Sequence, residues 1–182
     1  YFCNMILKRC FSFSIIALCF LFLSFTLPDK ILKKVNKEIE KTFDIKDFKL
    51  KLVSVNDSIL KKLSKTTKID HLYKIEKDNS IIGYAFVDKA PSKTDEFDYL
   101  ILLDRNLIIA KTKILIYRED YGGEIGSKRW LKQFIGKSSS DKLKYGKDII
   151  AISGATISAL SMTKSVNSFL IDLAILHKNN AI

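Results

Sequence analysis

Two apolar runs separated by a short polar turn constrain the fold of this chain more than any other feature. The runs are "FDYLILLD" (97–104) and "LIIAKTKILIY" (107–117), and they meet at Asp104-Arg105-Asn106. Apolar, β-branched and aromatic residues on both sides of such a turn predict a β-hairpin. Three earlier segments have the same character, so we expect further strands within 47–55, 71–77 and 81–88.

Helical patterns lie on both sides of this strand-rich region. Residues 29–46 repeat apolar side chains at helical spacing, and a second long helix is expected over 157–178. Shorter helices are expected after Asn56 and over 128–136, and "IIAI" (149–152) is typical of a short buried strand. Together these elements predict an α+β fold, in which a mostly antiparallel twisted sheet is flanked by helices.

The first 28 residues have the pattern of a targeting segment. Lys8 and Arg9 precede the apolar run 11–27, as in a signal peptide or a short membrane anchor. A buried core helix is the alternative, but the run is apolar on all sides rather than along one stripe. We therefore expect a signal peptide or membrane anchor over 1–28, a helical spacer over 29–46 and a domain over 47–182.

Such a segment predicts an extracytoplasmic location, either periplasmic or at the outer face of the inner membrane. The orientation of an uncleaved anchor stays open, because positive charge also follows the run, at Lys30, Lys33, Lys34 and Lys37.

The small number and the positions of the cysteines and histidines exclude several kinds of site. The three cysteines are Cys3, Cys10 and Cys19, so the folded part has no thiol for a disulfide, a nucleophile or a metal. The two histidines, His71 and His177, offer little for a triad or a zinc site. We therefore predict no catalytic side chains and no metal. The net charge is +11, but the lysines are scattered and only four arginines occur, which favours a solvated basic surface over nucleic-acid binding.

The most informative motif is "SGAT", Ser153 to Thr156, at the expected start of the last helix. The first turn of a helix presents unpaired N–H groups and a partial positive charge, which suit a phosphate. Gly154 and Ala155 allow a bulky group near the backbone, and Thr156, with Ser158 close behind, places a hydroxyl there. The alternative is that Thr156 is an ordinary helix cap.

"SGATIS" resembles the flavinylation motif of the FMN-binding domain family. That family includes extracytoplasmic subunits of sodium-translocating NADH:quinone reductase and of Rnf complexes. "GYAFVDKAP", "DYLILLDRNLIIAKTKILIYRED" and "YGGEIGSKRWLKQFIGK" are also similar to the family's pattern, so the resemblance covers roughly Ile81 to Ser168. It implies FMN in phosphoester linkage to Thr156, installed by a separate magnesium-dependent flavin transferase.

The chain departs from the family pattern close to this motif. An aspartate usually lies three residues before the serine of "SGAT", but that position is Ile150, and Asp148 lies two residues earlier. The proline of the family's glycine-rich turn is also absent from "YGGEIG". The chain therefore resembles a divergent, small, stand-alone member of the family.

We interpret the chain as an exported, membrane-associated flavoprotein that relays electrons to or from an unknown membrane redox partner, rather than as an enzyme with catalytic residues of its own. The alternative is a non-redox, membrane-tethered binding or assembly domain of the same fold that has lost the flavin, an interpretation that Ile150 favours. The near side of the FMN site is assigned to Ser153, Gly154, Ala155 and Ser158. The isoalloxazine wall is assigned to Tyr121, Gly122, Gly123 and Trp130, with a core position as the alternative for Trp130.

Overall fold

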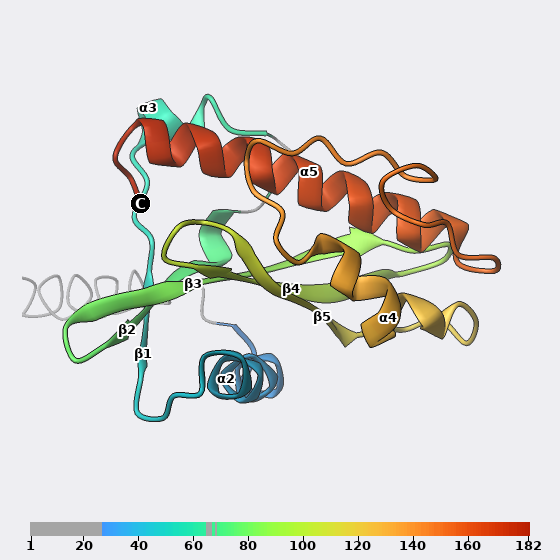
Figure 1. Cartoon of the computed structure of the whole chain (residues 1–182), viewed down its shortest axis with the longest axis horizontal. Helices are drawn as coiled ribbons and strands as arrows, with labels where there is room; N and C mark the ends of the chain where they lie inside the picture. Colours follow the sequence, from blue (N-terminus) through green and yellow to red (C-terminus); the bar gives the residue numbers. More distant parts are fainter. Residues whose placement is uncertain (1–26, 65–66, 68) are drawn as a thin grey trace, which may run out of the picture.

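The computed structural model describes residues 27–182 except 65, 66 and 68 (Figure 1). The predicted targeting segment therefore lies outside the described residues, apart from its last two positions. In chain order, the helices and strands are α2 (Asp29–Phe43), β1 (Lys49–Leu52), α3 (Asp57–Leu60), η1 (Ile69–His71), β2 (Leu72–Lys77), β3 (Ser80–Pro91), β4 (Glu96–Asp104), β5 (Ile109–Ile116), η2 (Gly123–Gly126), α4 (Lys128–Leu131), η3 (Lys132–Phe134) and α5 (Thr156–Lys178).

The centre of the domain is a five-stranded antiparallel sheet in the order β1-β2-β3-β4-β5. Each strand pairs with the next strand along the chain, so short turns suffice to connect most of them. Figure 1 shows α5 across one face of the sheet and α2 across the other. The predicted α+β class, with a mostly antiparallel sheet between helices, is confirmed.

The predicted hairpin is β4–β5, and its turn is stabilised by Asp104. The Asp104 carboxylate accepts hydrogen bonds from the N–H groups of Asn106 and Ile108, both at 2.9 Å. The β2–β3 turn places Asp78 and Asn79 at φ of 50° and 60°, the left-handed conformation that tight hairpins favour. These polar side chains explain where the chain reverses.

Apolar side chains fill both faces of the sheet, because helices cover both. In β4, Tyr99 and Ile101 face the α5 side, while Leu100 and Leu102 face the α2 side. All four are at most 1% exposed. This explains why β4 is a continuous apolar run rather than an alternating one.

The helix α2 is docked on the sheet through Ile31, Val35 and Ile39. Among the described residues, α5 is the one helix long and apolar enough to cross a membrane, yet half of its apolar stretch is buried. The buried side of α5 carries Met162, Val166, Phe169 and Leu173. Packing on the sheet therefore accounts for its apolar character.

The predicted buried strand over 149–152 is wrong. Ile149 is buried, but Ile150 is 68% exposed, and the only pairing here is an isolated bridge between Tyr145 and Ile149. Side chains take up the backbone groups instead: the Ile150 N–H donates to Gln133 Oε1 at 2.8 Å, and its carbonyl accepts from Trp130 Nε1 at 2.7 Å. The segment is thus held against α4 and η3 rather than added to the sheet.

Candidate functional site

The "SGAT" turn leads directly into α5. Gly154 has a φ of 79°, and Ala155 is the N-cap residue, so the helix begins at Thr156, one residue earlier than predicted. No side chain caps this helix end. The Thr156 hydroxyl donates only a long 3.4 Å hydrogen bond to the Ile152 carbonyl, and its side chain is exposed. The alternative in which Thr156 is an ordinary helix cap is therefore wrong.

The start of α5 has the electrostatic character of an anion site. The first N–H groups of a helix have no acceptor within the helix, and they carry partial positive charge. The first turn of α5 contains no acidic residue that would offset this charge. The exposed Thr156 hydroxyl thus lies beside uncompensated N–H donors.

A pocket of about 420 Å³ opens beside this helix end, which we call the SGAT pocket. Its volume lies within the range of about 300–1,000 Å³ that small-molecule sites occupy. The β3–β4 connection contributes Lys93, and the segment after β5 contributes three more residues. The pocket is lined by Lys93, Tyr117, Glu119, Tyr121, Gly154, Ala155, Thr156, Ile157 and Ser158.

Tyr117 fastens the first turn of α5 to the end of β5. Its hydroxyl lies 3.1 Å from the Ser158 hydroxyl, and its ring packs against Phe97 at 6.0 Å between centroids. Ser158 is 3% exposed, so its hydroxyl is directed into the protein. Both hydroxyl residues of this turn line the pocket, but Thr156 is exposed and Ser158 is buried.

Gly122 allows the segment after β5 to lie against the SGAT turn. It has a φ of 80°, and a Cβ atom there would lie 2.8 Å from the Ala155 Cβ and 3.1 Å from the Gly154 carbonyl oxygen. No L-residue fits such a position without strain. Gly123 differs, because a Cβ atom there meets nothing within 4 Å.

The charged residues of the pocket have different roles. Glu119 accepts hydrogen bonds from the Thr94 N–H at 2.7 Å and the Thr94 hydroxyl at 3.0 Å. Hydrogen bonding by Ser92 and by the Thr94 backbone lowers the pKa of Glu119 to about 2. Glu119 is thus an anion that holds the β3–β4 connection, and Lys93 on that connection is the cation of the pocket.

The structure brings together most, but not all, of the predicted site residues. Gly154, Ala155, Thr156, Ser158 and Tyr121 line the pocket, and Gly122 packs behind it. Ser153 is exposed in the turn but does not line the pocket.

Trp130 lies in the core, which was the alternative to a place in the isoalloxazine wall. It is 5% exposed, packs edge-on against Phe134 and is absent from the pocket lining.

Sequence reasoning missed Lys93, Tyr117, Glu119 and Ile157. One usable signal was present. Tyr117, Glu119 and Tyr121 alternate, and alternate residues of an extended chain share a face. Lys93 carries no comparable local signal, because only the pairing of β3 with β4 brings it to the pocket.

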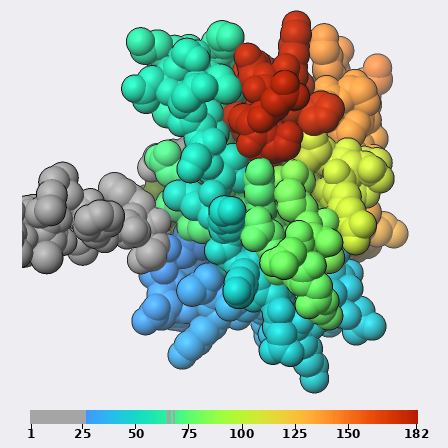
Figure 2. All heavy atoms as spheres, turned by 90° about the vertical axis from the view of Figure 1, so that its left-hand side faces the viewer, coloured from blue at the N-terminus to red at the C-terminus, as the bar shows by residue number. Residues whose placement is uncertain are grey.

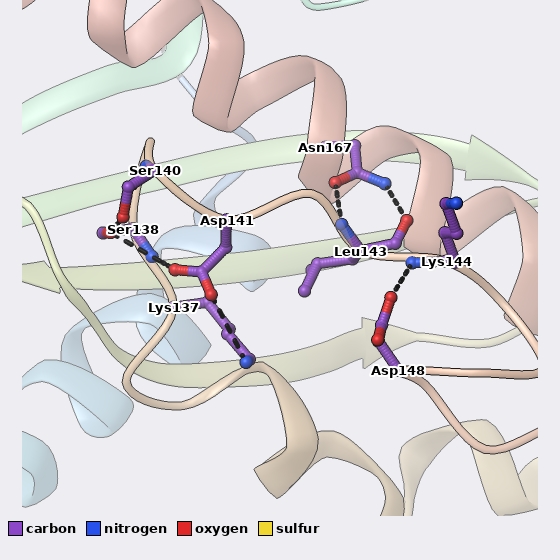
Figure 3. Close-up of polar contacts among 8 residues, drawn as sticks. All are labelled: Lys137, Ser138, Ser140, Asp141, Leu143, Lys144, Asp148 and Asn167. Atoms are coloured by element: carbon purple, nitrogen blue, oxygen red, sulfur yellow. Dashed lines mark hydrogen bonds and ion pairs between the residues drawn. The ribbon is translucent and has the colours of Figure 1, made fainter.

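Asp148, the carboxylate nearest to the position of Ile150, is engaged within its own loop. Its carboxylate accepts from the Lys144 N–H at 2.8 Å, and its N–H donates to the Lys144 carbonyl at 2.8 Å (Figure 3). Asn167 of α5 holds the same loop through two hydrogen bonds to the Leu143 backbone, at 2.9 and 2.6 Å. Asp148 therefore closes a turn, while the Ile150 side chain faces solvent.

Two comparisons bear on the family of this chain. A family model described as the FMN-binding domain matches residues 65–171, a range that contains every residue lining the SGAT pocket. No curated protein matches the chain. Within the described part of the chain, no three His, Cys, Asp or Glu side chains gather in a way that could hold a metal ion.

Proposed function

The chain belongs to the FMN-binding domain family, and on this basis we propose that it carries FMN covalently on Thr156 and relays electrons. Membership of the family makes it a flavin-binding protein with FMN as its cofactor, which confirms the resemblance recognised in the sequence. Our proposal goes beyond family membership in three respects: the phosphoester linkage, the electron relay and the extracytoplasmic location.

The residues of the SGAT pocket fit an FMN group. The N–H groups at the start of α5 and the Lys93 ammonium would hold the phosphate, and Thr156 would supply the ester oxygen. Tyr121, which is 85% exposed, and Ile157, which is 49% exposed, offer apolar surface for the ring. When bound, FMN supplies reversible electron transfer, while the protein positions it and tunes its potential.

One observation carries the covalent assignment. The Thr156 hydroxyl is exposed at an uncapped helix start, inside the region that the family model matches. A threonine at this position contributes little to the stability of the fold. We therefore assign its hydroxyl oxygen a chemical role, as the ester oxygen of the FMN linkage. The direct experiment is co-expression with a flavin transferase, after which we expect a yellow protein that keeps its colour on denaturation.

The second candidate function is a tethered, non-redox binding or assembly domain that has lost the flavin. Ile150, which replaces the family's aspartate, is the observation in its favour. A protein that stays colourless with an active transferase would support this alternative.

Changing Ile150 to aspartate tests whether this position limits loading. The side chain is 68% exposed and the backbone is held by Trp130 and Gln133, so a carboxylate would be solvated and the fold retained. With limiting transferase, we expect Ile150→Asp to load FMN faster than the natural protein, and the uncharged control Ile150→Asn to load no faster. If Ile150→Asp loads no faster than the natural protein, as measured by absorbance over time, this position does not limit loading.

The extracytoplasmic location is also part of the proposal, and it has its own test. The apolar run 11–27 after Lys8 and Arg9 supports export. Residues 5–40 fused to a reporter that is active only outside the cytoplasm should give activity. A control fusion in which Leu21 and Leu23 are changed to Arg should give none, since charge in the apolar run opposes insertion. An inactive natural fusion would remove the proposed location.

A further inference from the structure

The exposed side of α2 carries a stripe of lysines, together with the exposed carboxylates Asp29 and Glu40. Lys30, Lys33, Lys37 and Lys41 recur at spacings of three and four residues, which places them on one side of the helix. The opposite side is buried in the sheet through Ile31, Val35 and Ile39. All four lysines are exposed, and none takes part in the ion pairs of the described residues (27–182 without 65, 66 and 68).

The positive surface continues from α2 across β5 to α4. A groove of about 510 Å³ lies here, and Glu38 is the one carboxylate among its lining residues. Glu38 is already paired with a lysine of the groove, Lys111, at 2.7 Å. The remaining lysines of the groove are Lys41, Lys113, Lys128 and Lys132. We call these four, together with Lys30, Lys33 and Lys37, the lysine face.

On the opposite face of the sheet the lysines lie beside α5 rather than along it, with Lys142, Lys144 and Lys147 in the loop that Asn167 holds. The outward side of α5 carries only two lysines, Lys164 and Lys178, over a helix of 23 residues. Figure 2 shows α2 (blue) low on the molecule and α5 (red) at the top. The lysine face is set apart from these other lysines by its regular spacing along α2 and by its place directly after the apolar run.

The lysine face begins where the apolar run ends. Residues 11–27 form that run, and Asp29 is already the first residue of α2. Pro28 is extended, with φ −54° and ψ 139°, so α2 begins at Asp29. A membrane-inserted run would therefore hold α2 at the level of the lipid headgroups.

We propose that the lysine face lies on the anionic headgroups of a lipid bilayer and sets the orientation of the domain there. The inference rests on the proposed membrane association of residues 1–28, but not on the flavin. Lysines attract anionic lipids through charge, and each lysine near the surface strengthens binding roughly fivefold. In this orientation α5 lies on the side of the sheet away from the lipid, which leaves it open to a redox partner.

Amine footprinting of the whole, unflavinylated chain tests this inference. The chain is reconstituted into nanodiscs of phosphatidylcholine alone or with phosphatidylglycerol, treated briefly with an acetylating reagent and analysed by mass spectrometry. We expect Lys30, Lys33, Lys37 and Lys41 to react several-fold more slowly in the anionic discs. Salt at about 1 M should remove the protection, since it shortens the Debye length to about 3 Å.

Lysines elsewhere provide the internal control. Lys142, Lys144 and Lys147 lie in the loop that Asn167 holds against α5, and they should react equally in both discs. Changing Lys30, Lys33, Lys37 and Lys41 to glutamine should remove the anionic-lipid protection of Lys113 and Lys128. The matched variant with Lys142, Lys144, Lys147 and Lys178 changed to glutamine should keep it.

Equal reactivity of the lysine face in neutral and anionic discs would overturn the inference. Protection by soluble polyglutamate, without protection by anionic lipid, would also overturn it and would indicate an acidic protein partner instead. Because the experiment contains no flavin, a failure of FMN attachment leaves its result unchanged.

Discussion

Changing Thr156 to alanine is expected to abolish covalent flavin while leaving the domain folded. The substitution removes the hydroxyl of the exposed residue at the helix start, which lines the SGAT pocket. That hydroxyl makes only a 3.4 Å hydrogen bond and caps nothing, so the free energy of unfolding should change by no more than about 0.5 kcal/mol. Flavin fluorescence in a denaturing gel and thermal unfolding measure the two effects.

Two matched variants make this result specific. Thr156→Ser keeps an oxygen at the same place and should retain covalent flavin, whereas Thr156→Val keeps the branched shape and should lose it. Ser158→Ala should still load, because Ser158 is buried and its hydroxyl is engaged with that of Tyr117 at 3.1 Å. Covalent flavin on Thr156→Ala would show that another residue carries the ester.

Changing Gly122 to alanine is expected to have the second large effect. The new Cβ atom would lie 2.8 Å from the Ala155 Cβ, in a left-handed backbone conformation with φ 80°. Strain and overpacking together should lower the free energy of unfolding by about 2 kcal/mol and displace the SGAT turn. We therefore expect slower flavin loading together with a lower melting temperature.

Gly123 provides the matched control for this prediction. A Cβ atom at Gly123 meets no other atom within 4 Å, so Gly123→Ala should load normally and melt close to the natural protein. If Gly122→Ala loads and melts as Gly123→Ala does, the contact between the glycine turn and Ala155 does not shape the site.

Much of the fold is encoded locally and could be predicted for that reason. The turn at Asp104 and the apolar stripe of α2 depend on residues close together in the chain. The same holds for Asn56, which accepts from the Ile59 N–H and caps α3. The segment 149–152 was misassigned because its partners, Trp130 and Gln133, are distant in sequence and bind through side chains.

The site residues that belong to a local sequence motif could be predicted, whereas those that only the tertiary structure brings to the pocket could not. The SGAT turn and Tyr121 are in the pocket because the motif and the glycine turn are adjacent in space. Lys93 reaches the pocket through strand pairing, and its loop is held by Glu119. The sequence left ring stacking and a core position open for Trp130, and its aromatic surface packs in the core.

The intact mass of the natural protein, co-expressed with an active flavin transferase, tests the central claim most directly. We expect the mass to rise by that of FMN less one water, and peptide mapping to place the addition on Thr156. An unchanged mass, with the same transferase modifying a known acceptor protein in parallel, would contradict covalent attachment. An addition mapped to any residue other than Thr156 would contradict the assignment of the site.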